Sequence, residues 1–462
     1  MLVVPGRPTS DGLTWWVLSE DSGAPHVELV GPDGEDAGVV IRPLSLPQDG
    51  PVAKRCFLVS TTALRSDSVY RLDASRNGVL ASASSRTLPA SLPVGQSFTV
   101  ALGSCYSIAN DPGLTASYPP KLHDPNGRDP IRLRFLGGDQ LYMDLTASSG
   151  SPIIVGAPDP WEKYLAQWER LQFSTFLRAS PNLVLGDDHE FWNDYPHKSA
   201  WLTWSESERG GPVGRAMDRA FSLFQVGLNL EPGAVQAPPG GNLGALLGGV
   251  GRTFSLDVGP LSFFVLDVRT ARTRYDAGQP HFTAVPWLSA ARAWIQGLRG
   301  PGVLVLSQPL VEERAGAFAR TFHTMGDVNL PDYDDDFAAL WEALFAAPHD
   351  VVVLTGDIHW SRAYRIRRAG ASNRTVWEVV SSSLARIPGP ASGIGEATGK
   401  VEWRTGRGNW TRDYATNAAS TYTTLSFTPQ SGGVNVVARA FQVSSERGVG
   451  ASLLSRSSIG LT

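Results

Sequence analysis

The segment 182–194 constrains the fold of this chain more than any other, because an apolar run in it ends in a cluster of ionisable side chains. Residues 183–185 are Leu, Val and Leu, and Gly186 follows them. A short apolar run that stops at a glycine predicts a buried strand ending in a turn. Residues 187–190 are Asp, Asp, His and Glu, whose acidic members repel one another unless protons or metal ions intervene. Ligands of open α/β sheets bind beyond the carboxyl ends of strands, so the sequence predicts a ligand site here.

The same order of apolar strand, glycine and metal-capable side chain occurs at three further places. These places are 100–105, which ends at Cys105, 134–142, which contains Asp139 and Tyr142, and 351–359, which contains Asp357 and His359. Strand ends lie side by side in a sheet, so these side chains can converge with Asp188 and His189 although they are distant in sequence. One match would mean little, but four in one chain form a pattern that predicts a metal site.

The residue types in this pattern suit metal binding, because carboxylates, imidazole, thiolate and phenolate are all ligands once deprotonated. A hard ion such as ferric iron favours the phenolate and the carboxylates, and a softer ion favours the sulfur. The donors outnumber the needs of one ion, so two ions sharing a bridging carboxylate are expected. Each residue alone has an ordinary alternative: Cys105 as a small buried hydrophobe, Tyr142 as a core residue, Asp188 as a helix N-cap and Asp139 as a turn residue. Their joint occurrence favours the metal site.

The chain is expected to contain two domains. Residues 1–90 hold several short runs rich in Val, Leu, Ile, Trp and Phe between turn signals, which predicts an all-β sandwich. Leu64 followed six residues later by Tyr70 resembles the tyrosine corner of fibronectin-type-III domains. The segment 88–95 contains prolines and is the expected boundary. Beyond it strands alternate with helices, which predicts a second, α/β domain over 96–462.

Particular elements of the second domain can also be predicted. Asp159 is a suitable N-cap for a helix, and the apolar residues of 337–345 follow a helical spacing. The paired apolar runs within 253–268 predict a hairpin. The glycine-rich stretches 233–251 and 388–412 are expected to be loops.

Composition excludes several classes of partner. The chain has 40 Lys and Arg residues against 44 Asp and Glu residues, a formal charge of −4, which argues against a general nucleic-acid binder. Two cysteines cannot build a disulfide framework.

No apolar run is long enough for a membrane span, and no export signal or protein partner is evident. A cytoplasmic location is expected if this is the full gene product, and an extracytoplasmic one if it is a processed form.

The motifs together resemble those of the PhoD-like alkaline phosphatases, a branch of the calcineurin-like metallophosphoesterase superfamily. The resemblance covers residues from about 1 to 440 and rests on 103–105, 138–144, 187–190 with Asn193, 266–272, 307–309 and 355–360. The chain departs from the family at Tyr106, where many relatives have glutamine. The lid helix that covers the site in PhoD is not evident in this sequence.

The resemblance implies a four-layer α/β/β/α core preceded by an N-terminal Ig-like or fibronectin-III-like sandwich. It implies a ferric ion, Fe3+, whose ligands would be Cys105, Asp139, Tyr142 and His359. It implies one or more divalent ions, often Ca2+ and alternatively Zn2+, Mn2+ or Mg2+, whose ligands would be Asp139, Asp188 and Asp357. His189 stands where the superfamily places its catalytic histidine.

The sequence therefore predicts an enzyme that hydrolyses phosphate monoesters or diesters of small molecules, in which a metal-activated hydroxide attacks phosphorus. A phospholipase or nuclease is a second enzymatic alternative. A non-catalytic binding protein stabilised by a structural metal site is the alternative from a different class, although a structural site needs no additional histidine such as His189.

The expected roles around the metals are as follows. His189 would protonate the leaving alkoxide or orient the substrate, and Glu190 or Asp187 would hold its imidazole. Asp144 is a candidate ligand for an additional calcium ion. Candidate substrate-binding residues, each with a structural alternative, are Arg269, Arg272 and Asn193.

Overall fold

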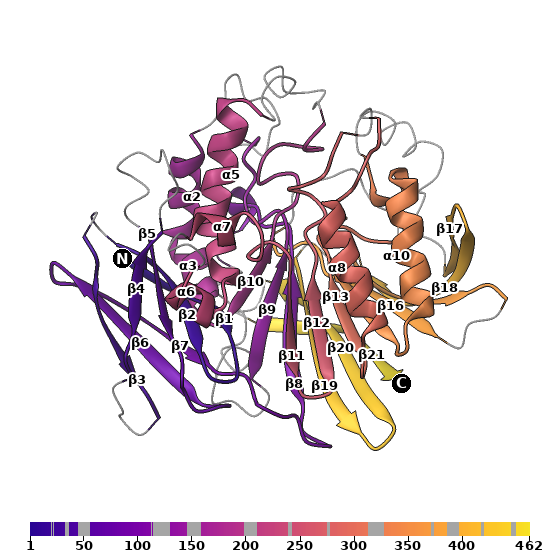
Figure 1. Ribbon diagram of the computed structural model, residues 1–462, viewed down its shortest axis with the longest axis horizontal. Helices are drawn as coiled ribbons and strands as arrows, with labels where there is room; N and C mark the ends of the chain where they lie inside the picture. The colour runs from indigo at the N-terminus through magenta and orange to yellow at the C-terminus, as the bar shows by residue number, and fades with distance from the viewer. Residues whose placement is uncertain are drawn as a thin grey trace.

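The computed structural model describes residues 1–19, 21, 23–32, 37–44, 56–111, 113, 130–145, 159–197, 210–238, 243–274, 278–312, 328–370, 374–385, 397–416, 420–444 and 450–462. In the described residues, four β-sheets and helices that are fewer than the strands make a mixed α/β protein (Figure 1). None of the helices in these ranges is long and apolar enough to cross a membrane.

Two small sheets form the N-terminal part of the chain. The first has the order β1 (Leu2–Pro8), β2 (Leu13–Leu18), β5 (Cys56–Thr61) and β4 (Val40–Pro43), and the second has the order β3 (His26–Val30), β6 (Val69–Arg76) and β7 (Val79–Arg86). Residues from both sheets, such as Trp15 and Leu72, share one buried apolar cluster. The Tyr70 hydroxyl accepts the backbone N–H of Arg65 at 3.0 Å, which is the kind of bond that a tyrosine corner makes.

Three strands of the first small sheet, β1, β2 and β5, are buried on both faces, because their other face packs on the rest of the protein, whereas β4 is only partly buried. Trp16 belongs to a second apolar cluster that includes residues of α2, α3 and α5, and its indole N–H donates to the carbonyl of Leu223 at 2.7 Å. Every residue of β1, β2 and β5 is buried. The N-terminal strands are therefore part of the main structure and not a loosely attached module.

The next sheet has six strands in the order β10 (Asn182–Leu185), β9 (Ile131–Gly137), β8 (Phe98–Gly103), β19 (Thr421–Gln430), β20 (Gly433–Ser444) and β21 (Gly450–Leu461). Strands β8, β9 and β10 are parallel, and β19 to β21 are antiparallel. The parallel part thus directs three strand ends to the same edge of the sheet.

The largest sheet has eight strands in the order β11 (Phe254–Val258), β12 (Leu261–Val265), β13 (Gly302–Val305), β14 (Val351–Thr355), β16 (Thr375–Val380), β15 (Ser361–Arg368), β18 (Gly406–Thr416) and β17 (Thr398–Trp403). Strands β12, β13, β14 and β16 are parallel. All five residues of β14 are buried, which is why this strand is a continuous apolar run in the sequence. The predicted hairpin within 253–268 is confirmed as β11 and β12.

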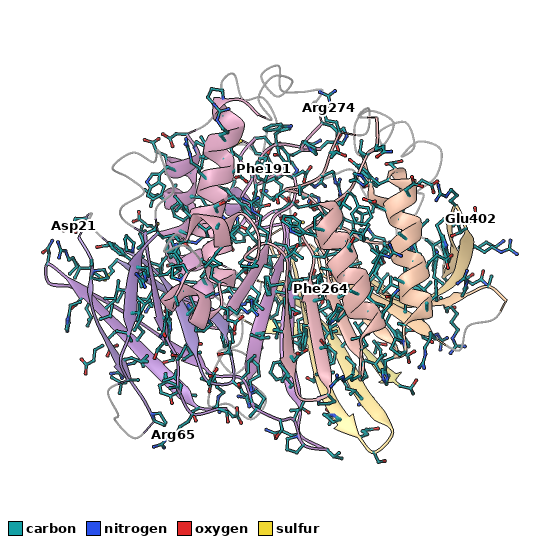
Figure 2. All side chains as sticks on the ribbon, in the orientation of Figure 1. Asp21, Arg65, Phe191, Phe264, Arg274 and Glu402 are labelled. Atoms are coloured by element: carbon teal, nitrogen blue, oxygen red, sulfur yellow. The ribbon has the colours of Figure 1, made fainter. Side chains whose placement is uncertain are left out.

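The two larger sheets share a buried core, and helices pack against each of them. Residues of both sheets share a buried cluster in which the rings of Phe135 and Phe263 lie 5.8 Å apart. The helices α2 (Pro160–Trp168), α3 (Leu171–Arg178) and α5 (Pro212–Phe224) share a core with the six-stranded sheet. On the eight-stranded sheet the corresponding helices are α8 (Val285–Gln296) and α10 (Asp334–Ala346). Figure 2 shows side chains such as Phe264 inside the body and Glu402 at its periphery.

The sequence predicted some elements correctly and others wrongly. Asp159 caps α2, since its carboxylate accepts the backbone N–H groups of Trp161 and Glu162, and α10 lies where the helical spacing predicted it. The expected loop 233–251 is wrong in part, because it contains most of α6 (Pro232–Gln236) and all of α7 (Gly244–Leu247).

The expected loop 388–412 is also wrong over most of the residues that are described. Residues 388–396 lie outside the described ranges, but the following residues form β17 and much of β18. Glycine and threonine obscured an alternation in which Val401, Trp403 and Trp410 are buried. Trp403 stacks on Trp341 of α10 at a ring separation of 5.5 Å, and this tertiary contact stabilises the hairpin.

A buried ion pair within the eight-stranded sheet gives a test of this fold. Arg362 donates to Glu378 at 3.1 Å, and the other oxygen of Glu378 accepts the backbone N–H groups of Leu310 and Val311. We expect Arg362→Met to lower the free energy of unfolding by about 3–5 kcal/mol, because it leaves a buried carboxylate without its cation. Urea unfolding measures this change. Arg367→Met, at an exposed position of the same strand, should change stability by less than about 0.5 kcal/mol, and equal effects of the two variants would contradict the assigned burial.

Candidate metal centre

The carboxyl ends of seven parallel strands meet at one place, three from the six-stranded sheet and four from the eight-stranded sheet. Backbone hydrogen bonds connect the segments that follow these strands. Cys105 N–H donates to the Gly138 carbonyl at 3.1 Å, and Gly356 N–H donates to the Ser307 carbonyl at 3.0 Å. The hydroxyl of Ser104 donates to the Ser381 carbonyl at 3.1 Å, which joins one sheet to the other. The predicted convergence of distant strand ends is therefore present.

Two of the glycines that precede the acidic residues are required by close approach. A Cβ at Gly356 would lie 2.4 Å from the Cβ of Ser104. A Cβ at Gly138, whose φ is +95°, would lie 2.5 Å from the Cβ of Asp187. Both distances are too short for any side chain, so glycine at these positions lets the carboxylates of neighbouring strands approach one another.

Three overlapping groups of side chains can hold a metal ion, and Asp139 belongs to all three. The groups are Cys105, Asp139 and His359; Asp139, Asp188 and His189; and Asp139, Asp187 and Asp357. Within each group the ligand atoms lie no more than 4.8 Å apart. A carboxylate shared in this way can bridge two ions.

Tyr142 completes the first of these groups. Its hydroxyl lies 3.4 Å from Oδ2 of Asp139 and 3.3 Å from Nε2 of His359. The sulfur of Cys105 lies 3.7 Å from the same Asp139 oxygen. The structure thus brings together the four residues that the resemblance assigned to a ferric ion.

The backbone at these residues adopts an uncommon conformation. Cys105, Asp139, Asp357 and His359 have φ values of 57°, 56°, 70° and 58°. These values lie in the left-handed region, which residues other than glycine seldom adopt. Such residues cost on the order of 1–3 kcal/mol each and cluster at functional sites, where the surrounding structure holds them. The turn after each strand therefore directs its side chain to the common centre at an energetic cost.

Without a cation the electrostatics of this centre are unfavourable. Burial and the neighbouring Asp188 raise the pKa of Asp139 well above its usual range. Burial also raises the pKa of Asp187, and Asp357 adds to this although Arg269 opposes it. Burial and Asp357 raise the pKa of the Cys105 thiol to about 12. Positive charge at this place would reverse these shifts, because it stabilises the ionised ligands.

An unpartnered carboxylate oxygen of Asp187 is a second observation that favours metal binding at this place. Oδ2 of Asp187 is buried and has no hydrogen-bond partner among the described residues, although Oδ1 accepts a bond from Arg269 at 2.5 Å. A buried carboxylate oxygen without a partner is costly unless an ion occupies the space that it faces. Asp187 was predicted to hold the histidine and not a metal, so this is a ligand candidate that the sequence did not indicate.

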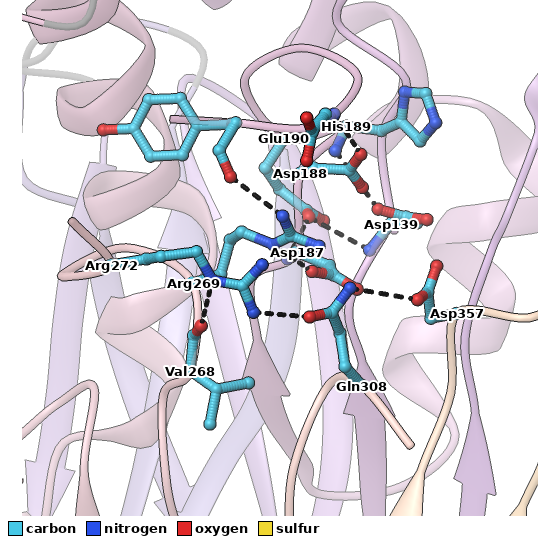
Figure 3. A network of polar contacts seen from close by, with 12 residues as sticks. Asp139, Asp187, Asp188, His189, Glu190, Val268, Arg269, Arg272, Gln308 and Asp357 are labelled. Carbon is cyan, nitrogen blue, oxygen red and sulfur yellow. Dashed lines mark hydrogen bonds and ion pairs between the residues drawn. The ribbon is translucent and has the colours of Figure 1, made fainter. Parts of the chain in front are cut away.

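Glu190 has a role different from the predicted one. It was expected, with Asp187 as the alternative, to hold the imidazole of His189. Its carboxylate instead accepts the backbone N–H groups of Asp139, Gln140 and Asp187 at 3.0, 2.7 and 2.8 Å (Figure 3). Burial raises its pKa to about 7, although these bonds oppose the shift. Glu190 therefore fixes the turns that carry two metal-capable aspartates.

The imidazole of His189 is held by Asp144. Its Nδ1 lies 2.8 Å from Oδ1 of Asp144, whose other oxygen accepts the N–H of Asn193 at 2.8 Å. Burial alone would lower the pKa of His189, but Asp144, Asp188 and Asp139 raise it well above its usual value. Asp188 shows the opposite effect, because His189 and Arg269 overcome its burial and lower its pKa. The surrounding carboxylates thus favour the protonated form of this histidine.

The predicted substrate-binding arginines are fully buried beside the acidic residues. Arg269 donates to Asp187 and, at 2.8 Å, to the carbonyl of Tyr195. Arg272 donates to the Val268 carbonyl at 3.0 Å and to the Gln308 amide oxygen, and Gln308 donates to Oδ2 of Asp357 at 3.2 Å. Figure 3 shows this chain from Arg272 through Gln308 to Asp357. Both guanidinium groups therefore act on the carboxylates of the centre.

No role was predicted for two further residues of the centre. Gln308 lies in the segment 307–309, which belongs to the family resemblance, and follows β13, and Ser382 follows β16. The same order of apolar strand and polar residue could have identified both. Asp144 was considered only as a calcium ligand, because nothing in its sequence position indicates a bond to His189.

Among solved structures the chain is similar to PhoD, with a TM-score of 0.66 and 16% sequence identity over 100% of this chain and 91% of PhoD. It also aligns with GAP50, the anchor in the inner membrane complex of Plasmodium, with a TM-score of 0.39 and 8% identity over 79% of this chain and 90% of that one. No family model matches the sequence, and no curated protein matches it. The chain therefore has a PhoD-like fold.

The crowding of carboxylates predicts an unusual effect of Asp139→Asn. In the presence of a chelator, the free energy of unfolding of this variant should equal that of the wild type or exceed it by up to about 1–3 kcal/mol at neutral pH. The reason is that the substitution removes a buried charge. The raised folded pKa means that the wild type loses stability as pH rises above about 4, so the advantage of the variant should grow with pH. The stabilisation by added metal ions should disappear in the variant.

Urea midpoints with and without chelator, at several pH values, measure these effects. Asp336→Asn is the matched control, because Asp336 is buried away from the centre and accepts bonds from His281 and from the N–H of Phe282. It should lower stability by about 1–2 kcal/mol with or without metal. A loss of metal-free stability in Asp139→Asn as large as in this control would contradict the proposed repulsion.

Proposed function

We propose that this protein is a metal-dependent hydrolase of phosphate esters, a PhoD-like phosphatase or phosphodiesterase. The observation that carries the proposal is the position of Asp139, shared by three metal-capable groups, next to the His189–Asp144 pair. With His189 beside the ions and not among their ligands, the site has a proton donor that a purely structural metal site does not need. The PhoD-like fold supports the same reading. The proposal includes a four-layer α/β/β/α core and an Ig-like N-terminal sandwich.

Two metal positions are proposed around Asp139. Cys105, Tyr142 and His359 would hold a ferric ion together with Asp139, and the phenolate and the carboxylate suit that hard ion. Asp188 and Asp357 would hold a divalent ion, calcium or alternatively zinc, manganese or magnesium, and the orphaned oxygen of Asp187 adds a ligand on that side. When bound, the ions would supply an activated water nucleophile and neutralise the charge of the phosphoryl oxygens.

The side chains of the protein would then move one proton and fix the reacting groups. Because Nδ1 of His189 faces Asp144, Nε2 is the nitrogen that can donate a proton to the leaving alkoxide. Asp144 holds the ring in that orientation and stabilises its charged form. The face of the ring lies against Tyr142, with ring centres 4.4 Å apart, which keeps the acid next to the proposed ferric ligand.

The arginines would contribute through the carboxylates. Arg269 holds Asp187, and Arg272 holds Asp357 through Gln308, so both keep negative ligands in place and reduce their repulsion. Asn193 remains a candidate for contact with substrate, since its backbone N–H already binds Asp144 at the edge of the centre.

The role of His189 as an acid can be tested by substitution. We expect His189→Ala to lower kcat for an alkyl phosphate, a poor leaving group, by about 10²–10⁴-fold, because a positioned acid contributes that much. The loss for an aryl phosphate with a good leaving group should be much smaller. Steady-state kinetics with both substrates gives the comparison, and His349→Ala, outside the centre, is the control. Equal losses for the two substrates would argue that His189 only binds substrate.

The metal content of the protein is the direct test of the proposed function. Elemental mass spectrometry on protein purified without chelators is expected to find iron near one per chain together with a divalent ion. Phosphate ester hydrolysis should be lost on chelation while the protein stays folded. Folded protein that takes up no metal when iron and calcium are supplied would overturn the proposal, and the binding-protein alternative would then gain weight.

A further inference from the structure

A group of buried serines lies behind the sulfur of Cys105. The segment after β16 runs along the segment after β8, and Leu384 N–H donates to the Ser104 carbonyl at 2.8 Å. Two hydroxyls lie near the sulfur as a result. The Oγ of Ser382 is 3.1 Å from the sulfur, and the Oγ of Ser104 is 3.3 Å from it.

A hydroxyl carries one proton, which separates the roles of these two serines. Ser104 donates its proton to the Ser381 carbonyl at 3.1 Å and accepts the N–H of Asp357 at 3.3 Å. Ser382 accepts the backbone N–H of His359 at 3.0 Å, and its own proton is directed at the Cys105 sulfur. Ser382 is therefore the hydroxyl suited to donate a hydrogen bond to a Cys105 thiolate.

The position of Ser382 is held from several directions. Its side chain is fully buried. Its carbonyl accepts the hydroxyls of Ser361 and Thr421 at 3.1 and 3.0 Å, and its N–H donates to Ser361 at 3.2 Å. The side chain cannot change rotamer without losing its bond from the His359 N–H, so the oxygen is held next to the sulfur.

We propose that Ser382 is a positioning residue for the metal centre, which tunes the Cys105 thiolate and fixes the backbone of His359 through one oxygen atom. The inference rests on the proposed function, because it requires a metal ion at Cys105. A hydrogen bond to a ligand sulfur withdraws electron density from it, which raises the reduction potential of the metal and lowers the energy of the sulfur lone pairs. Ser382 would therefore make the iron easier to reduce and its sulfur a weaker electron donor.

The test uses Co2+ as a probe, because its thiolate charge-transfer band reports on the sulfur whichever metal is native. In Co2+-loaded Ser382→Ala this band should move to longer wavelength, and in the iron-loaded variant the midpoint potential should fall. Ser382→Thr retains a hydroxyl and should restore both properties. Ser381→Ala is the matched control, since the buried Ser381 hydroxyl has no hydrogen-bond partner among the described residues, and it should change neither property.

The outcomes separate this inference from the proposed function. Wild-type protein that binds neither Co2+ nor iron would overturn the metal centre and this role with it. A normal thiolate band that is identical in wild type and Ser382→Ala would overturn the role of Ser382 alone. If Ser382→Ala does not fold, resonance Raman spectra of the wild-type protein equilibrated in H2O and in D2O decide the question. A metal–sulfur stretch that shifts in D2O supports the hydrogen bond, and an unshifted stretch overturns it.

Discussion

Asp139 is surrounded at short range by other buried acidic groups, and much of the structure around it serves to keep these groups together. Glu190 holds the turns of Asp139 and Asp187 by their backbone N–H groups. Arg269 neutralises Asp187 from one side, and Arg272 reaches Asp357 through Gln308 from another. These contacts leave Oδ2 of Asp187 without a hydrogen-bond partner among the described residues. The repulsion that remains is what a metal ion would relieve.

The proposed ligands come from two different sheets, so the core between those sheets sets the distances within the centre. Cys105, Asp139 and Asp188 follow strands of the six-stranded sheet, and Asp357 and His359 follow a strand of the eight-stranded sheet. Contacts between aromatic rings of the two sheets, such as Phe135 and Phe263, fix the position of one sheet relative to the other. Protein interiors are close-packed, so a change of core volume far from the ligands would be transmitted to their separation.

The sequence contained enough to predict the strand ends, because an apolar run followed by glycine and an acid has a direct physical meaning. It predicted the convergence of Cys105, Asp139 and His359 for the same reason. It could not predict which residue holds His189, since Asp144 and Glu190 both carry a carboxylate and only the path of the chain after β9 decides between them. The backbone N–H groups that donate to Glu190 belong to residues of any type, so no pattern in the sequence indicates these bonds. The β17–β18 hairpin was missed because composition was given more weight than the alternation of Val401 and Trp403.

The burial of β1, β2 and β5 on both faces has a consequence for how this chain can evolve. Asn182, the first residue of β10, donates to the carbonyl of Pro5 in β1 at 3.1 Å, and β10 leads directly to Asp187 and Asp188. A gene rearrangement that deleted the first strands would expose the apolar surface around Trp16 and release the start of the strand that carries these ligands. Recombination that takes the N-terminal strands from one parent protein and the centre from another would therefore break the contacts between them. Exchange of both parts together would keep these contacts.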